Sequence, residues 1–169
     1  LAASAMSRGR ESSTIFESPG TLKLRLKKAT GLKAADMNGK SDPYVIMSLG
    51  GVERRSRVIK RSLKPVWNQV FEFESSLDEV LKTGLLLRVW DKDLFSKDDD
   101  LGEVTVTLDA LRTGDAAEYQ EALSKQGSIF FDVMWQPGAA SHDAQAAAAP
   151  GSHAAAPTHA DDAADADTD

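Results

Sequence analysis

The segment 21–28 reads Thr21-Leu22-Lys23-Leu24-Arg25-Leu26-Lys27-Lys28, and its leucines alternate with basic residues. A period of two is typical of a β-strand, because successive side chains of a strand point to opposite faces of the sheet. The leucine face is expected to lie in a core and the basic face in water. The segment therefore predicts a strand that is buried on one side only, as in antiparallel sheets.

Further segments with strand character are separated by turn signals. They are residues 44–49, 52–59, 67–74, 85–90, 103–108, a weak one near Tyr119, and 128–135. Helical patterning is limited to single turns at residues 77–82 and 108–112. About eight short strands with few helices predict an all-β fold, an eight-stranded antiparallel β-sandwich.

The composition limits the class of protein. The 169 residues suffice for one domain with a sizeable core. The chain has no cysteine, which excludes disulfides and thiol chemistry. No run of about 18 apolar residues is present, so no membrane span is expected. The chain begins with Leu1 rather than Met, which suggests a piece of a longer protein.

Both ends of the chain differ in composition from the body. Residues 1–19 are polar and irregular and are expected to be a linker. Residues 137–169 are rich in Ala, Asp and His and contain no aromatic residue. Such a tail cannot bury enough apolar surface to offset the cost of ordering it, so a disordered tail is predicted. The folded domain is expected over residues 20–136.

The formal charge of −6 is unevenly distributed. Six aspartates and all three histidines lie beyond residue 138, and the rest of the chain is close to neutral. Within that body a basic run, residues 54–64, contrasts with two acidic loops. The basic run lacks interleaved aromatic residues, so nucleic acid is not expected as a partner.

Two loops carry five aspartates at strand ends. Ala35-Asp36-Met37-Asn38-Gly39-Lys40-Ser41-Asp42-Pro43-Tyr44 contains the first pair, and Trp90-Asp91-Lys92-Asp93-Leu94-Phe95-Ser96-Lys97-Asp98-Asp99 contains Asp91, Asp93 and Asp99. Hard oxygen donors without His or Cys favour Ca²⁺ over zinc. Neither loop has the ligand spacing of an EF-hand. An ordinary solvated acidic surface is the alternative, but carboxylates gathered on adjoining loops repel one another without a counter-ion.

Three motifs in order resemble the C2 domain, the calcium- and lipid-binding β-sandwich of protein kinase C and the synaptotagmins. They are Asp36 and Asp42 before Pro43-Tyr44, the stretch Leu63-Lys64-Pro65-Val66-Trp67-Asn68-Gln69-Val70-Phe71-Glu72-Phe73, and Asp91-x-Asp93 with Asp99 before Leu101-Gly102-Glu103. No strand is expected before residue 20, whereas residues 127–135 offer a strong strand at the far end. This pattern favours the circularly permuted form, type II.

The resemblance implies site residues in this chain. Two or three Ca²⁺ ions are expected on the side chains of Asp36, Asp42, Asp91, Asp93 and Asp99, with the backbone carbonyls of Ala35 and Lys92. Asp98 and Asp100 flank the matched position and are expected to contribute charge rather than ligands. Met37, Leu94 and Phe95 resemble membrane-inserting residues, although apolar side chains could equally join the core.

A lipid-headgroup site is also implied by the resemblance. Tyr44, Arg55, Arg57 and Trp90 match the phosphoinositide pocket of protein kinase C. This sequence departs from the family there, because arginines replace lysines and Asp98 stands where the family has Asn. The acid is unfavourable near phosphates. A plain solvated strand is the alternative interpretation of the basic residues.

The predicted function is Ca²⁺-dependent binding to anionic phospholipid membranes, including phosphoinositide as a candidate headgroup. A cytoplasmic module that associates with membranes peripherally and reversibly is expected. No catalytic constellation is expected in the domain, because the histidines all lie in the tail; a catalytic domain outside this segment stays open. The alternative is a Ca²⁺-independent scaffold whose basic strand binds an acidic protein partner.

Overall fold

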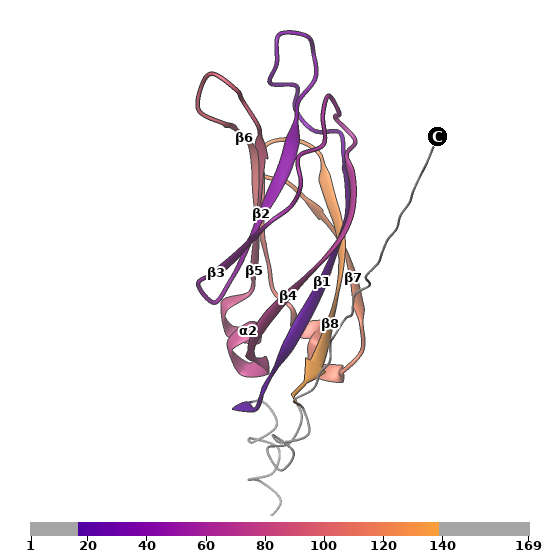
Figure 1. Cartoon of the computed structure of the whole chain (residues 1–169). Helices are drawn as coiled ribbons and strands as arrows, with labels where there is room; N and C mark the ends of the chain where they lie inside the picture. Colours follow the sequence, from indigo (N-terminus) through magenta and orange to yellow (C-terminus); the bar gives the residue numbers. More distant parts are fainter. Residues whose placement is uncertain (1–16, 139–169) are drawn as a thin grey trace, which may run out of the picture. The chain divides into compact units, whose positions relative to one another are not determined.

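The computed structural model describes residues 17–138, which form two four-stranded antiparallel sheets (Figure 1). One sheet has the strand order β4-β1-β8-β7, from β4 (Val66–Ser76), β1 (Pro19–Thr30), β8 (Ser128–Pro137) and β7 (Ala117–Ala122). The other has the order β3-β2-β5-β6, from β3 (Val52–Arg55), β2 (Pro43–Leu49), β5 (Leu85–Asp91) and β6 (Asp99–Val106). The predicted eight-stranded antiparallel sandwich is confirmed.

The core lies between the inner faces of the two sheets. Leu22, Leu24 and Leu26 of β1 are fully buried, so the alternation in the sequence marks the inner face as predicted. Each such leucine stabilises the fold by about 1.5–3 kcal/mol relative to an exposed one. The largest other fully buried side chains are Trp67, Phe73, Phe131, Leu32, Met47, Leu85, Leu87, Leu101 and Leu108.

The last strand completes the sheet around β1. Leu24 of β1 is paired with Phe71 of β4 on one side and with Val133 of β8 on the other. β8 therefore takes the position beside β1 that an additional N-terminal strand would otherwise fill. This is the permuted, type II arrangement that the strong C-terminal strand predicts.

The strand expected over residues 52–59 is shorter in the structure, because β3 ends at Arg55. Ser56 still contacts β2, since its amide donates to the Val45 carbonyl and its hydroxyl accepts from the Val45 amide. The next amide, that of Arg57, donates to the Gln69 side chain of β4. After Ser56 the chain is thus bonded to both sheets, since the Ile59 amide still donates to the Pro43 carbonyl of β2.

Three connections meet at one end of the sandwich, which we call the loop end. They are residues 31–42, 56–65 and 92–98, while α2 (Leu77–Thr83) and the 3-10 helix η1 (Asp109–Thr113) lie at the opposite end (Figure 1). Ser76 caps α2 by accepting a hydrogen bond from the Glu79 amide. Both short helices coincide with the single turns that the sequence predicts.

The expected disordered tail and most of the expected linker lie outside the described residues. Within residues 17–138, no helix is long and apolar enough to cross a bilayer. The boundaries 20 and 136 stay a prediction for the domain, with β1 beginning at Pro19 and β8 ending at Pro137.

Candidate functional site

Asp91 is the most buried carboxylate at the loop end, with 1% of its surface exposed. Its Oδ1 accepts a hydrogen bond of 2.6 Å from the Asp42 amide, whereas its Oδ2 is buried and has no hydrogen-bond partner. Burial raises the pKa of Asp91; the Asp42 amide opposes that shift, and the charges of Asp36 and Asp93 add to it. Asp36, Asp42 and Asp93 therefore all act on the Asp91 carboxylate.

Asp42 connects the three loops. Its carboxylate accepts from the Arg61 amide at 2.7 Å and lies 3.2 Å from the Lys60 ammonium, both on loop 56–65. Its carbonyl accepts from the Lys92 amide of loop 92–98. Pro43, which follows, keeps Asp42 out of the helical region of backbone space. Asp42 is thus fixed by backbone contacts as well as by its own side chain.

Asp36 begins a tight turn within loop 31–42. Its amide donates to the Lys40 carbonyl, and its carbonyl accepts from the Gly39 amide, both at 3.0 Å. Gly39 has a φ of +78°, a conformation that a residue with a Cβ adopts rarely. The Asn38 side chain accepts from the Lys40 amide. Gly39 thus supplies the positive φ that closes the turn between Asp36 and Lys40.

Asp99 enters from β6, where it is paired with Asp91 of β5. It lines a hollow of about 230 Å³ together with Ala35 of loop 31–42. The carboxylate of the neighbouring Asp100 forms a salt bridge with Lys125 at 3.0 Å. Asp99 and Asp100 both line this hollow beside the first loop, but Asp100 is already paired with a lysine.

The loop end fits a hard divalent cation by its chemistry, although its side chains are spread apart. Within residues 17–138 no three acidic or histidine side chains lie close enough together to form a ligating group. The candidate ligand atoms, carboxylate and backbone carbonyl oxygens, are the kind that Ca²⁺ prefers. The buried Asp91 Oδ2 lacks any partner, and a buried carboxylate oxygen is costly without one. An ion bound there would supply that partner.

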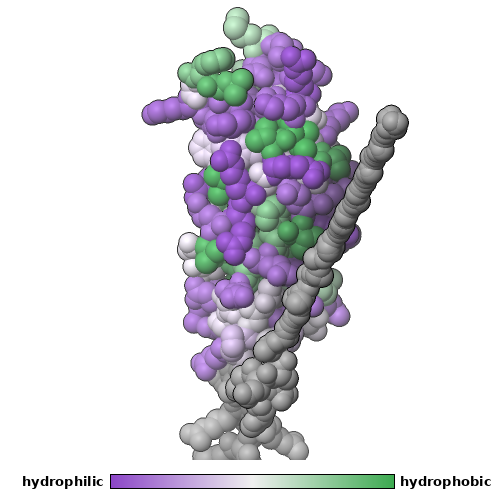
Figure 2. Space-filling model, in the orientation of Figure 1, coloured by the Kyte–Doolittle hydropathy of each residue, from purple (hydrophilic) through white to green (hydrophobic). Residues whose placement is uncertain are grey.

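Apolar side chains extend from the tips of two loops. Met37 and Phe95 are about 100% exposed, at 107% and 99%, and Leu94 is 76% exposed. Hydrophobic atoms accordingly appear at the loop end of the described residues (Figure 2). These side chains do not join the core, so the alternative that they pack inward is wrong. Large apolar groups left in water beside charged loops mark an interaction surface.

Tyr44, Arg55 and Trp90 lie together on the outer face of the sheet β3-β2-β5-β6. The Arg55 guanidinium stacks on the Tyr44 ring at 3.9 Å, and Tyr44 is paired with Trp90 on the next strand. The Trp90 indole nitrogen is buried and has no hydrogen-bond partner. Arg57 is held apart, because its guanidinium donates to the Trp67 carbonyl.

Several cations of the basic run are engaged within the domain. Arg54 stacks on Phe73, with 5.5 Å to the ring centroid, and donates to the Glu72 carbonyl of β4. Arg57 and Lys60 also make contacts within the domain. Arg55 is the arginine of β3 that lies on the outer surface, beside Tyr44. The run is thus largely a set of internal contacts rather than one free basic patch.

The comparison with known families rests on most of the folded part of the chain. Residues 20–123 match the C2 domain. The chain belongs to the C2 domain family. C2 domains are membrane-binding modules, and this one is related to synaptotagmins and C2-domain ABA-related proteins.

Relatives of this C2 domain occur in larger proteins. Synaptotagmin-4 of Arabidopsis thaliana is 36% identical over 124 residues, which cover 70% of this chain and 21% of that protein. Protein C2-DOMAIN ABA-RELATED 4 of the same plant is 36% identical over 61% of this chain and 58% of that protein. The chain thus spans about a fifth of the length of the synaptotagmin that it matches.

A solved structure supports the same relationship. The C2A and C2B domains of extended-synaptotagmin 2, in a calcium-bound form, match with a TM-score of 0.61 and 30% identity. The match covers 69% of this chain and 45% of that one.

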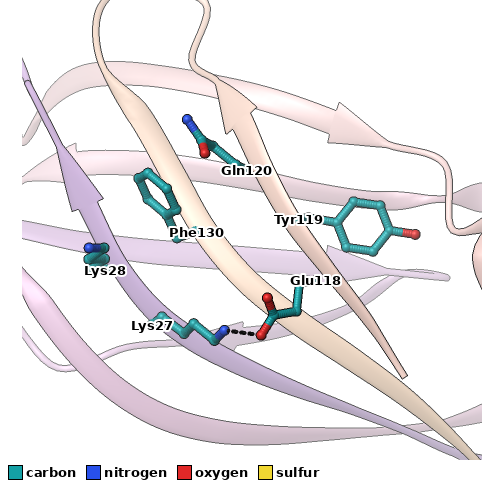
Figure 3. A pocket seen from close by; sticks show the side chains of 6 residues that line it. All are labelled: Lys27, Lys28, Glu118, Tyr119, Gln120 and Phe130. Carbon is teal, nitrogen blue, oxygen red and sulfur yellow. Dashed lines mark hydrogen bonds and ion pairs between the residues drawn. The ribbon is translucent and has the colours of Figure 1, made fainter. Parts of the chain in front are cut away.

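The C2 domain has a second hollow, of about 460 Å³, on the outer face of the β4-β1-β8-β7 sheet (Figure 3). Lys27 lies 2.7 Å from Glu118 and 3.3 Å from Asp132, and Lys28 lies over the Phe130 ring. The charged groups there are paired with one another rather than directed at a bound molecule. Within residues 17–138 no catalytic domain is evident beside the C2 fold.

Two features of the loop end were missed from the sequence. Lys60 and Arg61 contact Asp42, and Asp98 accepts hydrogen bonds from three different groups. The basic run beside an expected acidic cluster was the available signal for Lys60. No signal in the sequence shows which aspartate of the run 98–100 turns toward Tyr44.

Proposed function

We propose that this C2 domain binds Ca²⁺ and then docks on anionic phospholipid membranes. The ligands would be the carboxylates of Asp36, Asp42, Asp91, Asp93 and Asp99 with the carbonyls of Ala35 and Lys92. The observation that carries the proposal is that these aspartates lie on or next to the loops that carry the exposed Met37, Leu94 and Phe95.

The charge of the loop end would make membrane binding depend on Ca²⁺. Without a counter-ion, the acidic loops repel an anionic surface. Bound Ca²⁺ would neutralise these carboxylates and offer coordination positions to lipid phosphate. Asp42 and Asp91 hold the loops together through their mutual hydrogen bond. Lys40 and Lys97 are carried on the same loops and each add about 1 kcal/mol of attraction to an anionic membrane.

The outer face of the β3-β2-β5-β6 sheet would contact the headgroup. Arg55 supplies an exposed cation, and Trp90 lies on the neighbouring strand with its indole nitrogen buried. Tyr44 positions Arg55 by stacking, and Arg57 adds positive charge while bound to Trp67. Phosphoinositide is one candidate headgroup for this site. The protein is proposed to be cytoplasmic and to associate with membranes peripherally and reversibly.

Co-sedimentation with vesicles tests the proposal. Vesicles of phosphatidylcholine with phosphatidylserine are expected to bind the domain in Ca²⁺ and to release it in chelator. Mg²⁺ should support little binding, because it requires a tight octahedron and loses water reluctantly. Equal binding in chelator and in Ca²⁺ would contradict the proposal and favour the scaffold that binds an acidic protein partner.

Phe95→Ala is expected to weaken vesicle binding in Ca²⁺ roughly tenfold, since a phenyl ring no longer leaves water. The loss should appear as faster dissociation in surface plasmon resonance on captured vesicles. Ca²⁺ affinity without lipid should stay unchanged, because the side chain is 99% exposed and contacts no proposed ligand.

Val70→Ala is the matched control for Phe95→Ala. Val70 is 59% exposed on the outer face of the β4-β1-β8-β7 sheet, away from the loop end. Its loss should leave dissociation at the wild-type rate. If the two variants dissociate alike, the loop tips do not enter the membrane.

A further inference from the structure

Asp98 joins loop 92–98 to the outer face of the β3-β2-β5-β6 sheet. Its carboxylate accepts hydrogen bonds from the Tyr44 hydroxyl at 2.5 Å, from the Lys92 ammonium at 3.1 Å and from the Asp93 amide at 3.1 Å. The side chain is only 17% exposed. Three donors, from β2 and from loop 92–98 itself, thus fix the position of this one carboxylate.

Three donors stabilise the charged form of the Asp98 carboxylate: the Tyr44 hydroxyl, the Lys92 ammonium and the Asp93 amide. On the other side of the contact, the Tyr44 hydroxyl is the donor to this carboxylate. A negative charge, paired with Lys92 at 3.1 Å, therefore lies at the hydroxyl end of the Tyr44 ring.

The same ring carries the cation of the headgroup site. Arg55 stacks on the face of Tyr44, while Asp98 holds its hydroxyl. The Trp90 N–H, on the strand paired with Tyr44, is a donor without an acceptor. The Trp90 nitrogen is buried, so a headgroup phosphate would accept hydrogen bonds from the exposed Arg55 guanidinium. Additional phosphates on the same headgroup bring more negative charge toward Asp98.

We propose that Asp98 is a specificity-determining residue, which makes the Tyr44–Arg55–Trp90 site prefer phospholipid headgroups with one phosphate over polyphosphorylated ones. This inference rests on the proposed membrane function. The repulsion acts at short range in a partly buried site, where solvent screens charges less than at an open surface. Removing the charge should therefore change the selectivity between headgroups and not only the overall affinity.

Asp98→Asn is the main test, because the amide keeps the shape and an oxygen acceptor but loses the charge. Its affinity for soluble inositol 1,4,5-trisphosphate, measured by calorimetry in chelator, should rise by roughly tenfold. In Ca²⁺, its affinity for phosphatidylinositol bisphosphate vesicles should rise by a larger factor than its affinity for phosphatidylserine vesicles. Asp98→Ser should give the same result if Asp98→Asn does not fold.

Two controls separate charge from loop structure. Tyr44→Phe removes the hydroxyl that binds Asp98 but leaves its charge, so trisphosphate affinity should not rise. Adding Arg55→Ala to Asp98→Asn should remove the gain, because the cation that receives the phosphate is lost. A gain that persists without Arg55 would place the headgroup elsewhere and overturn the inference.

The calorimetry in chelator is independent of the Ca²⁺-dependent docking, so failure of the proposed function does not obscure the result. Unchanged trisphosphate affinity in Asp98→Asn and Asp98→Ser would overturn the inference. A gain for the soluble headgroup without a gain for bisphosphate vesicles would also overturn it, since the site would then take free inositol phosphate rather than a lipid.

Discussion

Replacing Asp91 and Asp93 together by Asn is expected to abolish Ca²⁺ binding and Ca²⁺-dependent vesicle association. Two proposed ligands lose their charge at once, and the affinity of an oxygen-ligand site for Ca²⁺ depends strongly on how many charged ligands it has. We expect affinity to fall on the order of 100-fold or more, as measured by calorimetry without lipid. Vesicle co-sedimentation in Ca²⁺ should then resemble that of the wild type in chelator.

The fold should survive this double substitution. The Asp91→Asn side chain retains an oxygen that can accept from the Asp42 amide, the contact that Asp91 makes at 2.6 Å. The change also removes a buried charge whose Oδ2 has no partner and which Asp36 and Asp93 repel. A buried unpaired charge destabilises a fold, so the melting temperature in chelator should be at least that of the wild type.

The control for this prediction is the pair Asp78→Asn and Asp109→Asn, which removes two acids from α2 and η1 at the opposite end. It makes the same change in net charge and should keep Ca²⁺ binding. Retained Ca²⁺ affinity in the Asp91 and Asp93 variant would refute the assignment of the loop end as the metal site.

Local patterns were sufficient to predict the sandwich. The alternation of Leu22, Leu24 and Leu26 marks one buried face because side chains of a strand alternate, and the structure buries all three completely. Sequence pattern was less informative after Ser56, where the chain is bonded to both sheets. Val52 to Ile59 looks like one strand, but Ser56 and Arg57 bond to different sheets and end β3 at Arg55.

The candidate site was predicted less completely than the fold. The positions of Asp42 and Asp91 at strand ends indicated that the two residues lie near each other. A hydrogen bond from the Asp42 amide to the Asp91 carboxylate connects them. Spacing could not show which nearby cations contact the site, since the Lys60 contact depends on how loop 56–65 turns back. The role of Asp98 likewise depends on a contact with Tyr44, 54 residues away in the sequence.

Trp67 connects the core to the loop end, and Trp67→Ala is expected to cause the largest loss of stability. The side chain is completely buried. Its removal leaves a large cavity, which costs about 3–5 kcal/mol. For a domain of this size such a loss lowers the melting temperature by roughly 10–25 °C. Thermal unfolding in chelator, followed by circular dichroism, measures this effect without any contribution from bound ions.

Trp67→Phe separates packing from the anchoring of loop 56–65. The Trp67 indole donates to the Arg57 carbonyl at 3.0 Å, and the Arg57 guanidinium donates to the Trp67 carbonyl. Phenylalanine keeps most of the apolar volume but loses the indole N–H, so a stability loss of only about 1–2 kcal/mol is expected. Hydrogen exchange in residues 57–61 should nevertheless become faster, because one of the contacts that hold this loop to β4 is gone.

The two Trp67 variants give different predictions for the site. Loop 56–65 presents Arg61 and Lys60 to Asp42, so loosening it should alter the surroundings of one proposed ligand while the sandwich stays folded. Trp67→Phe is therefore expected to lower Ca²⁺ affinity without lipid by a few fold at most, since Arg61 contributes one hydrogen bond to Asp42. If Trp67→Ala melts within about 3 °C of the wild type, the tryptophan is not the packing centre that its burial indicates.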